Sequence, residues 1–206
     1  MKKIIATAML LLMVAAMLSA GAKEEAIQSL DNAKIMLGRD DFAGAQNEID
    51  YAQTKIAEIL AEQLLPFIPE APAGFRLEEK NAKALGSAGA ILGSANSIIA
   101  TAKYSRDDAE LNLTISSGGV LGQAGGLLGG IASLFGGLSV GSGAKTIRVK
   151  GYTGTQEFDP DEESGTLSIQ VGEKISVIVE AHGIGDAGLM IAIAEAVDLA
   201  RLESSF

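Results

Sequence analysis

A cluster of prolines within residues 66–74 divides this sequence into two parts with different hydrophobic periods. Proline has no backbone N–H and a fixed φ, so the cluster breaks any helix and favours a stiff, extended connection. Before it, apolar residues recur every three or four positions, and after it they alternate with polar residues. The first pattern predicts helices and the second predicts strands. We therefore expect a helical hairpin over residues 23–65, a proline-rich linker over 66–74 and an α+β domain over 75–206.

The hairpin is predicted to contain two antiparallel helices. The first covers about residues 23–37 and ends at Gly38, because glycine is favoured just after the last helical residue. Asp40 or Asp41 can cap the second helix, since a carboxylate accepts hydrogen bonds from the unpaired N–H groups at a helix start. The first helix carries these apolar residues on one face: Ile27, Leu30, Ala33 and Leu37.

The second helix carries a narrow apolar stripe with charged residues elsewhere. Its members recur at alternating steps of three and four: Phe42, Ala45, Ile49, Ala52, Ile56 and Ile59. Such a stripe is typical of helices that pack against another element. It can bind the scaffold, a second copy or another helix, and we take Phe42, Ile49 and Ile56 as candidate partner-binding residues.

The start of the second helix, Asp41-Phe42 followed by Ala45 and Ala52, is similar to the second helix of a tetratricopeptide-type unit. The usual Trp, Tyr and terminal Pro of such a unit are missing, and no second copy follows. Because a solenoid needs several repeats to bury its core, we interpret the segment as a single helical hairpin.

After the prolines, alternation of apolar and polar residues predicts an antiparallel sheet with one buried face. The alternating segments lie within residues 98–104, 111–115, 147–158, 167–171 and 175–179. Asp186 is then expected to cap a final helix, whose core-facing residues are Leu189, Ile193, Val197 and Ala200. Strands followed by a closing helix predict an α+β fold.

The order of elements over residues 72–203 resembles a known family. A first strand follows Pro72-Ala73-Gly74-Phe75, and then come a small-residue stretch, a hairpin, a helical crossover and a meander containing IRVKGYTGTQEF and GTLSIQVGEKISVIVEAHG. With the last amphipathic helix, this order is similar to exported proteins of the PsbP-like α/β/α fold, known also from photosystem extrinsic subunits and a Ran-release factor. That fold is used mostly for binding and assembly. The resemblance implies such a role and no catalytic residues, although fold alone does not give function.

The first 22 residues have the three parts of an export signal. Lys2 and Lys3 form a basic start, residues 4–18 an apolar core, and Ala20-Gly21-Ala22 a small-residue cleavage site. The apolar core is shorter than the roughly 20 residues of a spanning helix, so cleavage before Lys23 is expected, with a cut after Ala20 or an uncleaved anchor as alternatives. A periplasmic or extracellular location follows.

Charge and cysteine content exclude several function classes. The formal net charge is −10, and loss of the two lysines of the signal makes it −12. An acidic chain repels phosphate backbones and anionic lipid, so nucleic acid is not an expected partner. The chain has no cysteine, which excludes disulfides, thiolate zinc sites, a cysteine nucleophile and a lipoprotein anchor.

The segment 118–143 contains eleven glycines and no charged residue. Gly118, Gly122, Gly126 and Gly130 lie four apart, which on a helix makes a flat groove for packing or membrane association. Because strands on both sides are expected to share one sheet, we favour a crossover packed on that sheet. A mobile segment and a membrane-inserted helix are the alternatives.

Few residues point to chemistry. Asp159, Asp161, Glu162 and Glu163 crowd one turn, but they lack the ligand spacing of an EF-hand, so no specific metal is expected. His182 is the only histidine and has no recognisable partner. The segment 183–188 matches G-x-G-x-x-G between a strand and a helix, but it lies too near the end to leave a second strand of a dinucleotide-binding unit. We expect no cofactor.

These observations together predict an exported, non-enzymatic binding or assembly protein whose hairpin contacts a protein partner or a second copy. The alternative is a membrane-associated envelope protein that uses residues 118–143. A small-ligand carrier is a further possibility, which the low aromatic content disfavours because apolar pockets are commonly lined by aromatic side chains.

Overall fold

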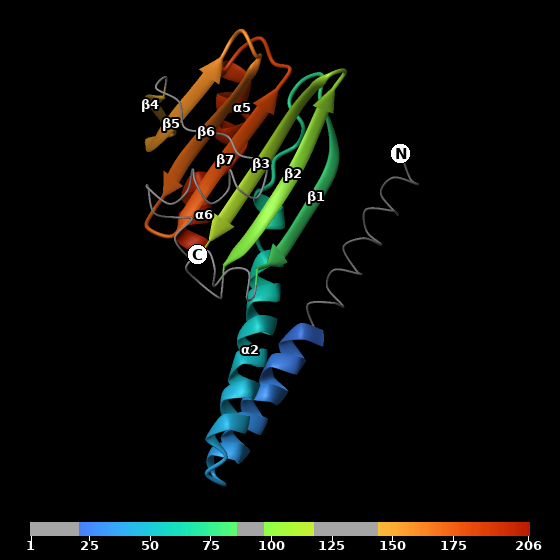
Figure 1. Cartoon of the computed structure of the whole chain (residues 1–206), viewed down its shortest axis with the longest axis vertical. Helices are drawn as coiled ribbons and strands as arrows, with labels where there is room; N and C mark the ends of the chain where they lie inside the picture. The colour runs from blue at the N-terminus through green and yellow to red at the C-terminus, as the bar shows by residue number, and fades with distance from the viewer. Residues whose placement is uncertain (1–20, 86–96, 118–143) are drawn as a thin grey trace.

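A computed structural model describes residues 21–85, 97–117 and 144–206 and has an α+β fold (Figure 1). Two helices come first and project from one end of a seven-stranded antiparallel sheet. Two short helices follow the last strand and lie on one face of the sheet. The predicted fold class is confirmed, while the expected glycine-rich crossover over residues 118–143 lies outside the described residues.

The hairpin begins with a helix over residues 21–37, and a turn connects it to α2 (Phe42–Glu62). The N–H of Gly38 donates to the carbonyl of Lys34 at 3.2 Å, which ends the first helix. Asp41 caps α2, because its Oδ1 accepts from the N–H of Gly44 at 2.9 Å. Of the two aspartates considered, Asp40 instead adopts a positive φ of 60° in the turn.

The sheet consists of two meanders that meet at its centre. The strands are β1 (Arg76–Ala84), β2 (Ile98–Arg106), β3 (Ala109–Ser117), β4 (Lys145–Val149), β5 (Tyr152–Asp159), β6 (Ser164–Val171) and β7 (Ile175–His182). Their spatial order is β1-β2-β3-β7-β6-β5-β4, and every neighbouring pair is antiparallel. The strands β3 and β7, which join the two meanders, pair over eight residues with Leu113 opposite Val179.

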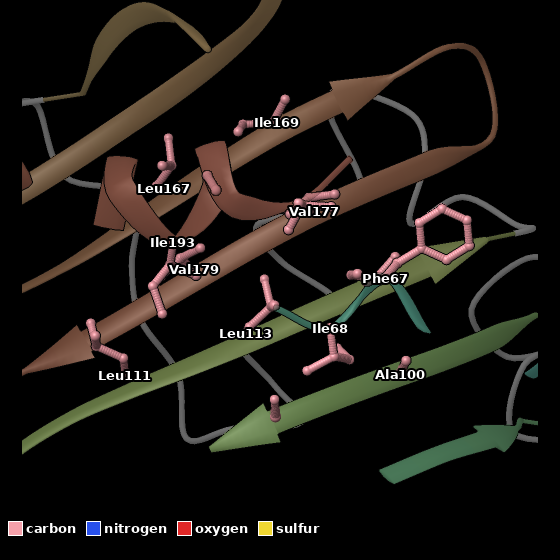
Figure 2. Packing of buried hydrophobic residues seen from close by; sticks show 14 of the residues in the cluster. Phe67, Ile68, Ala100, Leu111, Leu113, Leu167, Ile169, Val177, Val179 and Ile193 are labelled. Atoms are coloured by element: carbon pink, nitrogen blue, oxygen red, sulfur yellow. The ribbon is translucent and has the colours of Figure 1, made fainter. Parts of the chain in front are cut away.

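One face of the sheet forms the core (Figure 2). Leu113, Val179 and Ile169 are fully buried there, and Ile193 packs over them from the last part of the chain. The same cluster includes Ala57, Ala61 and Leu64 at the end of α2. It also includes Phe67, which lies in the short 3₁₀ helix η1 (Leu65–Phe67), and Ile68, so the proline-rich segment contributes to the core.

The chain closes with two helices, not the single helix that the sequence predicts. The first is α5 (Gly188–Ala196) and the second is α6 (Leu199–Ser205). Val197 is extended between them, and Asp198 starts α6 by accepting from the N–H of Arg201 at 3.1 Å. Because α6 starts anew at this cap, its residues face other directions than they would in a continuous helix. Leu199 and Leu202 are buried, while Ala200, which was expected in the core, is exposed.

The central position of Leu113 predicts a large loss of stability on truncation. Leu113→Ala leaves a cavity in a close-packed core and is expected to lower the free energy of unfolding by about 2–5 kcal/mol in urea titrations. Leu77→Ala is the matched control, because Leu77 lies on the edge strand and is 38% exposed. Equal losses for the two variants would contradict this assignment of the core.

Candidate functional site

The residues buried between the two helices of the hairpin are small. Ala26 and Ala33 of the first helix and Ala45 and Ala52 of α2 are each at most 5% exposed. Short side chains allow two helices to pack closely, but they bury little apolar area between them. The predicted stripe of α2 is therefore split between alanines that face the first helix and large residues that do not.

Large apolar side chains lie on the outside of the hairpin. In α2, Phe42 is 67% exposed and Ile56 is 42% exposed, while Ile49 is half-buried. In the first helix, the residues of the predicted apolar face other than Ala33 are about half exposed: Ile27, Leu30 and Leu37. The candidate partner-binding residues are thus available at the surface of the described chain.

Several exposed apolar residues of the two helices lie on the same side of the hairpin, whereas Ile35 and Tyr51 do not. Successive residues of a helix are about 100° apart, so Leu30 and Leu37 fall on one flank of the buried Ala33. In α2, Phe42, Ile49 and Ile56 fall on one flank of Ala45 and Ala52. Because the helices are antiparallel, these two flanks face the same way. We call the surface formed by Leu30, Leu37, Phe42, Ile49 and Ile56 the apolar side.

The opposite side of the hairpin is polar and slightly hollowed. A depression of ≈ 370 Å³ is lined by Glu25, Gln28, Ser29, Asn32, Asn47, Glu48 and Tyr51. Tyr51 donates a hydrogen bond to Glu25 at 2.7 Å, and Lys55 forms ion pairs with Glu25 and Glu58 at 3.1 Å. The hydrogen bonds from Tyr51 and Lys55 hold the pKa of Glu25 below its ordinary value. This network joins the two helices at the surface of the hairpin.

The sheet face away from the core carries a polar cluster that spans β2, β3 and β7. Glu110 accepts from Lys103 at 2.6 Å and from Asn112 at 2.8 Å, and these hydrogen bonds lower its pKa. Glu180, opposite Asn112 in the register, is only 7% exposed, and burial raises the pKa of its carboxyl. His182 lies opposite Glu110 at the end of β7.

The sequence pattern did not reveal this cluster. Two carboxylates lie near His182. Glu180 is in the same strand, β7, and Glu110 is in β3, far away in the sequence. Glu110 and Glu180 occupy the positions that alternate with core residues, and such positions look like ordinary solvated ones in the sequence. Nothing in the alternation distinguishes a buried carboxylate from an exposed one.

Other predicted features have ordinary structural roles or lie elsewhere. In the acidic turn, Asp159 Oδ1 accepts from the N–H groups of Asp161 and Glu162 at 2.9 and 3.2 Å, which shapes the turn between β5 and β6. Gly183 has a φ of 66°, and a Cβ there would lie 2.7 Å from the carbonyl oxygen of Asp108, so this strand-to-helix turn requires glycine. The candidate groove residues lie outside the described residues: Gly118, Gly122, Gly126 and Gly130.

The described ranges, 21–85, 97–117 and 144–206, contain no helix long and apolar enough to cross a membrane. They also contain no group of three or more acidic or histidine side chains placed to hold a metal ion.

Comparison with protein-family models, with curated proteins and with solved structures found no match.

The opposite pKa shifts of two glutamates predict opposite effects of pH. Burial disfavours the ionised form of Glu180 in the folded state, which raises its folded-state pKa. As pH rises above about 4.5, the carboxyl ionises more readily in the unfolded state, so the free energy of unfolding falls. We expect Glu180→Gln to be more stable than wild type at pH 7 in urea titrations. The difference should shrink as pH falls below about 4.5, because the wild-type carboxyl then becomes protonated in the unfolded state as well.

Glu110→Gln is the matched comparison. The pKa of Glu110 is lowered, so its ionised form contributes stability above about pH 4.5 that is lost as pH falls through the folded-state pKa. This variant should be less stable than wild type at pH 7 and approach it at low pH. Changes of the same sign in both variants would contradict the assigned environments.

Proposed function

We propose that this chain is an exported binding or assembly protein that engages a protein partner through the apolar side of its hairpin. The observation that carries the proposal is the division of residues in the hairpin. Alanines fill the contact between its helices, while Leu30, Leu37, Phe42 and Ile56 remain exposed. Exposing these side chains to water costs free energy that a docked partner would recover.

The form of the surface favours a helical partner. It is two helices wide and runs along the hairpin, so it offers the parallel ridges between which a further helix or helix pair packs. The hairpin also projects from the sheet, which leaves room for a partner along its length (Figure 1). The proposal assigns no catalytic residue to the chain.

The resemblance of residues 72–203 to the PsbP-like fold supports a binding role only at the level of fold. Export through residues 1–22 is a further part of the proposal, and it rests on the basic start, the apolar core and the small residues before Lys23. The alternative role for residues 118–143 in an envelope membrane has no observation in the described residues to support it.

A photo-crosslinking amino acid in place of one surface residue tests the proposal in the cells that naturally make the protein. At Ile56, the probe should give adducts of defined mass, because that side chain lies on the apolar side. At Gln28, on the polar side, the same probe should give at most a faint background. Intact mass of the recovered protein would also show whether the chain starts at Lys23.

The two probes lie on opposite sides of the same hairpin, Ile56 in α2 and Gln28 in the first helix, so the comparison is made within one protein. Equal adducts at Ile56 and Gln28, or none at Ile56 in properly folded protein, would overturn the proposal. The mass of the adduct distinguishes a second copy from another protein.

A further inference from the structure

We infer that the partner of the apolar side is a second copy of this chain, docked through the same surface in an antiparallel four-helix arrangement. This inference rests on the proposed function and names the partner. A two-fold dimer requires a self-complementary surface, in which each residue meets its counterpart across the axis. Three properties of the hairpin meet that requirement: the spacing of its residues, the place of the sheet and the exposed area.

The spacing in α2 is symmetric about Ile49. Phe42 and Ile56 each lie seven residues from it, which is two helical turns in either direction. A two-fold axis that crosses α2 near Ile49 therefore brings Phe42 of one copy onto Ile56 of the other, twice. The largest side chain of the apolar side, Phe42, then covers the smaller Ile56, and Ile49 meets its own equivalent at the axis.

The same axis suits the first helix. Glu25 contacts both Tyr51 and Lys55, which places residue 25 level with the turn of α2 between them. Antiparallel helices advance by equal steps in opposite directions, so Leu30 lies about level with Ile49. The axis near Ile49 thus also passes near Leu30, which would pack on its own equivalent.

The place of the sheet selects this arrangement. The sheet lies at the end of α2 far from the turn of the hairpin (Figure 1). An axis perpendicular to the helices puts the two sheets at opposite ends, so they do not collide when the apolar sides meet. It also keeps apart the two sheet parts, since residues 66–206 of each chain carry 10 basic and 17 acidic side chains, and charges farther apart than about 8–10 Å are largely screened at physiological salt.

The exposed area is sufficient for such a dimer. Of the residues that form the apolar side, Leu30, Leu37, Phe42 and Ile56 have exposed fractions from 42% to 67%. With about 180 Å² for a large apolar side chain, they correspond to about 370 Å² per copy and about 740 Å² in a pair. Because apolar atoms make up roughly 56–65% of an interface, the total is about 1,100–1,300 Å², above the roughly 1,000 Å² expected of a specific interface.

The absence of cysteine from the chain makes a direct test possible. Ile49→Cys places one thiol at the proposed axis, and the full chain in a glutathione redox buffer should form a disulfide-linked dimer. Asn32→Cys is the matched control on the polar side and should stay monomeric under the same conditions. Phe42→Cys combined with Ile56→Cys should also form a covalent dimer, because those positions meet across the axis.

Light scattering during size exclusion tests the unmodified protein. Wild type should elute as a dimer, and Ile56→Asp should dissociate at least tenfold more readily, while circular dichroism shows an unchanged fold. A monomer at all concentrations, or equal disulfide formation at positions 49 and 32, overturns the inference. If the monomer still gives a photo-adduct with another protein at position 56, the proposed function stands and only the second copy is excluded.

Discussion

The packing of the end of α2 into the sheet core determines how the rest of the molecule is arranged. Ala57 and Ala61 are buried against the sheet, and Leu64 is fully enclosed one turn later. Ala45 and Ala52, further back on the same unbroken helix, are buried against the first helix. One helix therefore belongs to two packing units, and its position in the core sets the direction in which the hairpin projects.

Side-chain size explains why the two units differ. In the sheet, large aliphatic residues such as Leu113 and Val179 meet in the core, where burial of apolar area is the main source of stability. In the hairpin, alanines occupy the contact, and Glu25, Tyr51 and Lys55 add polar contacts between the helices at its surface. Large residues of the hairpin such as Phe42 and Ile56 are consequently left exposed at its surface.

Much of the fold could be predicted from the sequence because its periods are strong. The alternation around Leu111 and Leu167, and the glycine that ends the first helix, predict elements close to those observed. The two helices at the end of the chain were predicted less accurately, as a single helix. The reason is that Asp198 caps a new helix within a continuous apolar pattern. Division of the chain into separate domains at residues 66–74 stays a prediction, and Phe67 and Ile68 share the core of the sheet.

The candidate site was predicted in part. The stripe residues Phe42, Ile49 and Ile56 could be found from their spacing, but the spacing alone groups them with Ala45 and Ala52, which face the other helix. Which members of a stripe are covered depends on the distance between helices, and that distance is a property of the packed pair. The cluster of Glu110, Glu180 and His182 depends on strand order, which the sequence does not contain in any local form.

The length of α2 has a mechanical consequence. Its 21 residues form one continuous rod of about 30 Å. Because the helix has no break, a small tilt at Ala61, where α2 packs on the sheet, would displace Phe42 at the other end over a larger distance. A change in how α2 packs on the sheet would therefore be amplified at the turn of the hairpin. A molecule bound near Phe42 would move with it.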